Sequence, residues 1–121
     1  KNGLGFTTKA QPSDQIAFFQ TSGTVLAIYP RERLAEDISP VLPPSEKATF
    51  SGITLAQCVK DKADVDMLLQ QAEKAGGRIV KPGQNTFWGG YSGYFADPDG
   101  YFWEIAWFDQ WQFNEQGHVI V

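Results

Sequence analysis

The sequence contains one cysteine, Cys58, and one histidine, His118. A single cysteine excludes a disulfide within the chain and a cysteine-rich zinc site. Because Cys58 lies in the apolar run GITLAQCV, we interpret it as a small buried hydrophobic side chain rather than a nucleophile. The histidine lies in a turn-like tail, FNEQGHVIV, and the sequence has no nucleophile elbow. A hydrolase triad is therefore not expected.

Positive charge and long apolar runs are also scarce. Ten basic residues against 14 acidic ones give a formal net charge of −4, and the pI is near 4.8. This balance disfavours binding to nucleic acid backbones and to anionic lipid surfaces. No apolar run approaches the roughly 20 residues that cross a bilayer, and no basic-then-apolar signal opens the chain. We therefore expect a soluble, cytoplasmic protein with no nucleic-acid or membrane partner.

The clearest predicted element is an amphipathic helix over residues 61–77, DKADVDMLLQQAEKAGG. Its apolar residues recur at helical spacing, Asp61 is placed to cap its start, and Gly76 and Gly77 end it. The segments that alternate like strands are residues 52–59 before the helix and residues 78–82, 91–97 and 101–108 after it. Asp-Pro-Asp-Gly, residues 97–100, is typical of a tight turn between the last two strands.

Part of this strand-helix-strand-strand-strand unit is repeated. AFFQTSGTVLAIYP near the start resembles GYFADPDGYFWEIAW, with Phe19 falling on Phe95 and Gly23 on Gly100. The front of the chain therefore matches the end of another module, whose first strand and nearly all of whose helix are not among these 121 residues. We expect a single domain over 1–121, made of the rest of module one (1–40), a linker (41–50), module two (51–110) and a C-terminal tail (111–121).

A module of this kind cannot bury the face of its sheet alone. We therefore expect an α+β fold in which paired βαβββ modules, with curved mixed sheets, pack around a cleft and the first module is incomplete at its N-terminal end. RERLAEDI, residues 31–38, is predicted to form a short helix. The prolines that follow it mark the connection between the modules.

Glu104 is the one acidic side chain in the run YFWEIAWF. Strand alternation groups it with Phe102 and Ala106 on one face, away from the bulky residues that belong against the helix, so Glu104 is expected to line the cleft. Gln57 is the second polar residue in an apolar strand. Because a buried carboxylate needs a partner, Glu104 is either a metal ligand or general base, or a structural hydrogen-bond acceptor.

The segments LAQCV, VDMLLQQAEKAGG and TFWGGYSGYFADPDGYFWEIAW resemble the vicinal oxygen chelate superfamily, which includes glyoxalases, bleomycin-resistance proteins and ring-cleaving dioxygenases. The likeness covers nearly the whole chain. Enzymes of this family hold a divalent metal in the cleft, with ligands from the first and fourth strands of each module. The resemblance implies that Glu104 and Gln57 are the only candidate metal ligands, because Ala27 stands where module one would need a carboxylate. No cofactor is assigned, and a divalent metal stays open.

We therefore expect a glyoxalase-like protein that binds a small organic molecule between the modules without a complete metal site. Glu104 is the expected catalytic residue if the protein is an enzyme. Two alternatives stay open: a metal-dependent lyase, isomerase or dioxygenase that uses Glu104, and a drug-sequestering protein of the bleomycin-resistance kind. The resemblance also implies a homodimer. The residues expected to contact the ligand are Gln57, Trp88, Tyr94, Phe102 and Glu104.

Overall fold

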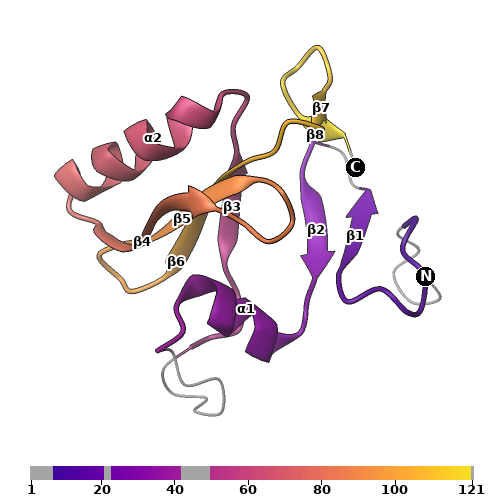
Figure 1. The fold of residues 1–121 in the computed structure, drawn as a ribbon, viewed down its shortest axis with the longest axis horizontal. Helices are drawn as coiled ribbons and strands as arrows, with labels where there is room; N and C mark the ends of the chain where they lie inside the picture. The colour runs from indigo at the N-terminus through magenta and orange to yellow at the C-terminus, as the bar shows by residue number, and fades with distance from the viewer. Residues whose placement is uncertain (1–6, 21–22, 42–49, 121) are drawn as a thin grey trace.

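A four-stranded sheet forms the centre of the protein (Figure 1). The computed structural model describes residues 7–20, 23–41 and 50–120. The strand order is β3-β6-β5-β4, with β3 parallel to β6 and the other neighbours antiparallel. The helix α2 connects β3 to β4, so the predicted βαβββ order and the α+β class are confirmed. The bounds are β3 (Leu55–Cys58), α2 (Lys62–Lys74), β4 (Arg78–Asn85), β5 (Tyr91–Ala96) and β6 (Phe102–Trp107).

The helix α2 ends at the predicted glycines. Gly76 has a φ of 105°, a left-handed conformation that glycine adopts without strain, and the Gly77 N–H donates to the Ala72 carbonyl at 2.9 Å. At the other end, Asp61 occupies the N-cap position, but its side chain makes no capping hydrogen bond. The start of α2 is therefore held by packing of its apolar side rather than by the predicted side-chain cap.

The turn between β5 and β6 is also as predicted. The Gly100 N–H donates to the Asp97 carbonyl at 2.9 Å, and Gly100 has a φ of 88°. Asp97 Oδ1 accepts the backbone N–H groups of Asp99 and Tyr101, while its Oδ2 accepts the Trp103 indole N–H at 3.1 Å. These hydrogen bonds hold the pKa of the Asp97 carboxyl below its usual value. The DPDG segment is thus a self-supported turn.

The described part of module one consists of a two-stranded antiparallel sheet and a helix. Strand β1 (Ala17–Gln20) pairs with β2 (Val25–Ile28), and α1 (Arg31–Ile38) follows, which confirms the predicted short helix. The tail contains a small hairpin, β7 (Gln112–Phe113) with β8 (Val119–Ile120), where the sequence analysis predicted only a turn. Most of the predicted linker and the first six residues lie outside the described residues. Neither described helix has the length and apolar character that a membrane crossing requires.

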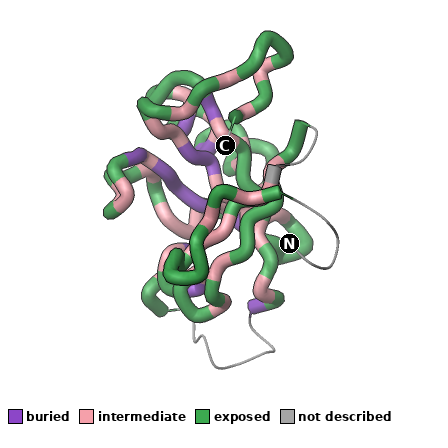
Figure 2. Tube along the Cα trace, turned by 90° about the vertical axis from the view of Figure 1, so that its right-hand side faces the viewer, coloured by how far each residue is buried: buried purple, intermediate pink, exposed green. Residues whose placement is uncertain are grey.

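The central sheet is covered on both faces. On one face, Val65 and Leu69 of α2 pack with Ile105 and Val59. On the other face, Ala35 and Ile38 of α1 form a second buried cluster. Figure 2 shows buried stretches in the inner part of the fold and exposed segments around them. The α1 cluster is completed by Phe50 and Tyr94, against which Leu34, Val80 and Phe102 pack.

Candidate functional site

A row of side chains crosses the sheet on the face that α1 covers. Ala56 of β3 pairs with Glu104 of β6, Glu104 pairs with Tyr94 of β5, and Tyr94 pairs with Lys81 of β4. Because cross-strand partners share a face, all four point toward α1. Phe102 lies on the same face and packs on the α1 cluster. The structure therefore brings together three predicted site residues, Glu104, Tyr94 and Phe102.

The helix α1 adds Asp37 to this row. The Tyr94 hydroxyl donates a hydrogen bond of 2.6 Å to Asp37 Oδ2. Lys81 Nζ donates to the Asp37 backbone carbonyl at 2.6 Å and lies 3.5 Å from Asp37 Oδ1. Neither Asp37 nor Lys81 was predicted from the sequence to belong to the site. The available signals were a lysine in the apolar strand RIVKP and an aspartate beside the apolar stripe of RERLAEDI.

The environment of Glu104 changes its protonation. Burial of the carboxyl raises its pKa to about 7, and the negative charge of Asp37 acts in the same direction. The hydroxyl groups of Ser92 and Tyr94 and the charge of Lys81 partly oppose this shift. A pKa raised toward neutrality suits this carboxyl to donate or accept a proton near neutral pH.

A second row lies beside the first, formed by Cys58, Ala106 and Ser92. Ser92 is fully buried, and its hydroxyl lies close enough to the Glu104 carboxyl to favour the charged form. Burial raises the pKa of the Cys58 thiol to about 11, and the charge of Glu104 adds to the effect. The thiol therefore stays protonated at neutral pH, which fits the interpretation of Cys58 as a packing residue. The small side chains of this row leave Glu104 without bulky neighbours on that side.

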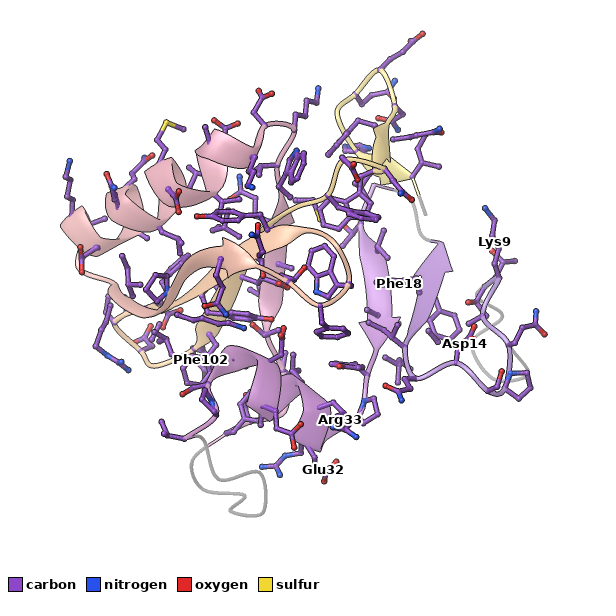
Figure 3. The ribbon with its side chains drawn as sticks, in the orientation of Figure 1. Lys9, Asp14, Phe18, Glu32, Arg33 and Phe102 are labelled. Carbon is purple, nitrogen blue, oxygen red and sulfur yellow. The ribbon has the colours of Figure 1, made fainter. Side chains whose placement is uncertain are left out.

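A pocket of about 410 Å³ opens between the two modules. Its lining comes from the segment before β1, the residue that follows β2, the helix α1 and the loop between β4 and β5. Asp37 belongs both to this lining and to the row beneath it, so the pocket adjoins Tyr94 and Glu104 through Asp37. Figure 3 shows Arg33 and Phe102 on different sides of α1. We call this space the inter-module pocket, lined by Gln15, Tyr29, Arg33, Glu36, Asp37 and Phe87.

Gln57 lies elsewhere. It pairs with Ile105, so it points to the face that carries α2, and Ala56 takes the position opposite Glu104. Gln57 lines a second pocket of about 370 Å³ together with Leu68 and Gln71 of α2. The expectation that Gln57 and Glu104 share one cleft is therefore wrong for the described structure. Binding of a ligand by Gln57 stays a prediction, and it now concerns the pocket beside α2.

Trp88 lies in an aromatic cluster on the loop between β4 and β5. Its ring is 5.7 Å from that of Phe108 and 6.1 Å from that of Trp111. The cluster ties this loop to the segment that follows β6. The neighbouring Phe87 is 85% exposed and lines the inter-module pocket. A ligand contact by Trp88 therefore stays a prediction, while the adjacent Phe87 faces the pocket.

The donor set around Glu104 does not fit a divalent metal. Among the described residues, no group of three or more His, Cys, Asp or Glu side chains is arranged to hold one. The β3 neighbour of Glu104 is Ala56, which has no ligand atom in its side chain. The neighbouring carboxylate, Asp37, is already bound by Tyr94 and Lys81, and the Lys81 ammonium group repels a cation. No catalytic step through a metal is derived from this arrangement.

A family model and one similar solved structure indicate the same family. The model of the Glyoxalase/Bleomycin resistance protein/Dioxygenase superfamily matches residues 1–105. No curated protein matches this sequence. A glyoxalase-related enzyme from Fulvimarina pelagi is 31% identical with a TM-score of 0.58, and the match covers 98% of this chain and 82% of that chain.

Two further solved structures are similar at lower identity. An NAD-dependent benzaldehyde dehydrogenase from Legionella pneumophila is 19% identical with a TM-score of 0.57, over 80% of this chain and 75% of that chain. A glyoxalase/bleomycin resistance protein/dioxygenase from Nocardioides is 23% identical with a TM-score of 0.45, over 88% of this chain and 70% of that chain. The Legionella structure indicates a shared fold alone.

Proposed function

We propose that this chain, which belongs to the Glyoxalase/Bleomycin resistance protein/Dioxygenase superfamily, binds a small organic molecule in the inter-module pocket without a complete metal site. The observation that carries the proposal is the position of Asp37. This residue lines the pocket and also accepts the hydrogen bond of Tyr94, which stands next to Glu104 on the sheet. A ligand in the pocket thus contacts a polar network that leads to a carboxyl with a pKa near neutrality.

In this proposal the described residues have different roles in ligand binding. Asp37 accepts a hydrogen bond from the ligand, because a carboxylate has more acceptor sites than Tyr94 and Lys81 occupy. Tyr94 and Lys81 keep Asp37 in place. Phe102 packs with the α1 cluster and supports the helix that carries Asp37, while Phe87 is the apolar side chain of the pocket lining. The volume of about 410 Å³ is in the range of pockets that hold small molecules.

A second candidate function is a lyase or isomerase in which Glu104 transfers a proton. The pKa of about 7 favours it, because general acid–base catalysis is most efficient when the pKa of the catalytic group is close to the working pH. In an isomerase the Glu104 carboxylate takes a proton from one atom of the substrate and returns it to a neighbouring atom. In a lyase the electron pair of the broken C–H bond forms a double bond and expels a leaving group from the neighbouring carbon. The bound molecule has to extend past Asp37 to reach Glu104.

The test of ligand binding is a fragment screen on ¹⁵N-labelled protein at neutral pH. We expect fragments to shift the backbone resonances of Tyr29, Asp37 and Phe87, and Asp37→Ala to weaken this binding. The matched control is Asp64→Ala, which removes a carboxylate from the first turn of α2 and leaves the pocket unchanged. Fragments that bind only beside α2, around Gln57, would refute the proposal.

Two further measurements test proton transfer by Glu104 and the homodimer. If Glu104 transfers protons, substrates with an acidic C–H bond exchange hydrogen for deuterium in the presence of the protein, and Glu104→Gln abolishes the exchange. A homodimer, which we include in the proposal, predicts twice the 13.5 kDa chain mass by light scattering.

A further inference from the structure

The charged side chains of the inter-module pocket occur in pairs. Arg33 Nη1 lies 3.1 Å from Glu36 Oε2, both on α1. Asp37, the third charged group of the lining, is paired with Lys81 beneath it. The described lining, taken with Lys81, therefore has one positive charge for each negative charge.

This pairing works against a charged ligand. A carboxylate that approaches Arg33 also meets Glu36 and Asp37, and an ammonium group that approaches Asp37 also meets Lys81 and Arg33. Either ligand has to give up water without gaining an unopposed partner, or has to displace an existing partner. An uncharged ligand avoids this cost, because it leaves both pairs intact.

The remaining lining residues suit an uncharged ligand with a ring and a hydroxyl or amide group. Burial raises the pKa of Tyr29, and the charge of Asp37 adds to this, so the phenol stays protonated and can donate a hydrogen bond. Gln15 offers both a donor and an acceptor. Phe87, 85% exposed, presents an apolar ring at the rim that a ligand ring covers on binding.

We propose that the inter-module pocket selects uncharged polar ligands that carry an aromatic or apolar ring, in preference to amines and carboxylates of the same shape. This inference rests on the proposed function and specifies its ligand class.

Three probes of nearly equal size test the selectivity: benzyl alcohol, benzylamine and benzoate. Each is titrated into ¹⁵N-labelled protein at pH 7, and the dissociation constant is taken from the resonances of Tyr29, Asp37 and Phe87. We expect benzyl alcohol to bind about tenfold more tightly than either charged probe. Equal or tighter binding of a charged probe at these residues would overturn the ligand class and leave the proposed function standing. If none of the three probes shifts these resonances, the ligand class is overturned, and the fragment screen alone decides the proposed function.

Charge variants make the test sharper. Glu36→Gln leaves Arg33 without its partner and should turn the preference toward benzoate, whereas Arg33→Gln leaves Glu36 and should turn it toward benzylamine. Both side chains are more than half exposed, so the fold is expected to tolerate either change. Glu73→Gln on α2 and Arg78→Gln on β4 change the net charge equally at exposed positions outside the pocket. If the pocket variants keep the wild-type preference, or if the controls change it as much, charge pairing does not set the selectivity.

Discussion

The Tyr94 hydroxyl donates to Asp37 Oδ2 across 2.6 Å, which joins the central strand β5 of module two to the helix α1 of module one. Tyr94 is only 1% exposed, and burial raises the pKa of its phenol well above the usual value. The hydroxyl therefore remains a donor at all physiological pH values. This hydrogen bond fixes the position of Asp37 relative to Glu104, and the following predictions depend on that arrangement.

Glu104 should titrate near pH 7 in the folded protein. Burial is the main cause of its raised pKa, and the charge of Asp37 is the second. Asp37→Asn removes that charge and should lower the pKa of Glu104. The measurement is a ¹³C carboxyl NMR titration of the wild type and of Asp37→Asn. The Glu73→Gln variant identifies the signal of an exposed glutamate, with which the signal of Glu104 is compared. A Glu104 midpoint near 4.5 in the wild type would contradict the prediction.

Stability should fall between about pH 4.5 and 7 because of Glu104. Its folded pKa lies above its unfolded value, so the folded state binds more protons in this interval and loses stability as the pH rises through it. The shift from 4.5 to about 7 corresponds to about 3 kcal/mol. Glu104→Gln should therefore stabilise the protein more at pH 8 than at pH 4, as measured by urea unfolding. A variant that is equally affected at both pH values would show that Glu104 is not desolvated.

Tyr94→Phe should cost about 1–2 kcal/mol of unfolding free energy, because it removes a buried hydrogen bond to a charged group while keeping the ring. Urea unfolding at pH 7 measures the change. Tyr101→Phe is the matched control, since Tyr101 is 60% exposed. The two variants should differ by most of the predicted amount, and similar values for both would argue against a strong Tyr94–Asp37 interaction.

The protein should bind metal at far less than one equivalent per chain. The described carboxylates on the sheet face that α1 covers are Glu104 and Asp37, and Asp37 is already bound by Tyr94 and Lys81. One remaining carboxylate is too few to hold a divalent metal. Elemental analysis after purification without chelators, and again after soaking with Zn, Ni, Mn and Fe(II), measures the content. About one metal per chain that is lost in Glu104→Ala would establish a metal site and refute this prediction.

Cys58 should react slowly with thiol reagents at pH 7. Burial, followed by the charge of Glu104, raises its pKa to about 11, so little thiolate is present. The rate of reaction with a chromogenic disulfide is compared between the folded protein and the protein unfolded in urea. Cys58 is the only cysteine of the sequence, so the whole signal comes from it. Folding should slow the reaction by more than tenfold, whereas equal rates would indicate an accessible, activated thiol.

The local structure of the chain could be predicted from sequence better than its site. Apolar periodicity located α2, and the composition of DPDG located the turn before β6, because both depend on neighbouring residues. Neighbouring residues do not determine whether Gln57 points to the same face of the sheet as Glu104. Alternation gives the two faces of β3, but which one shares a side with Glu104 depends on the register with β6, a contact between residues 48 positions apart.

The pairing of Asp37 with Lys81 and Tyr94 is also set by a long-range contact. The helix α1 was predicted with its correct bounds, but no local pattern specifies which face of the sheet it covers. The strands of the tail hairpin are two residues each, too short for alternation to be detected. Glu104 and Phe102 share a face, as strand alternation predicted, whereas Tyr94 reaches the same face through the register of β5 with β6, which alternation does not give.

Different residues of the eight-residue helix α1 pack on the sheet and line the pocket. Ala35 and Ile38 hold it against the sheet, while Arg33, Glu36 and Asp37 line the pocket. Substitutions at Arg33 and Glu36 can therefore diversify recognition while the strands beneath stay the same. In evolution or in directed libraries, this one helix is the part of the protein on which a new ligand preference can arise at the least cost to the scaffold.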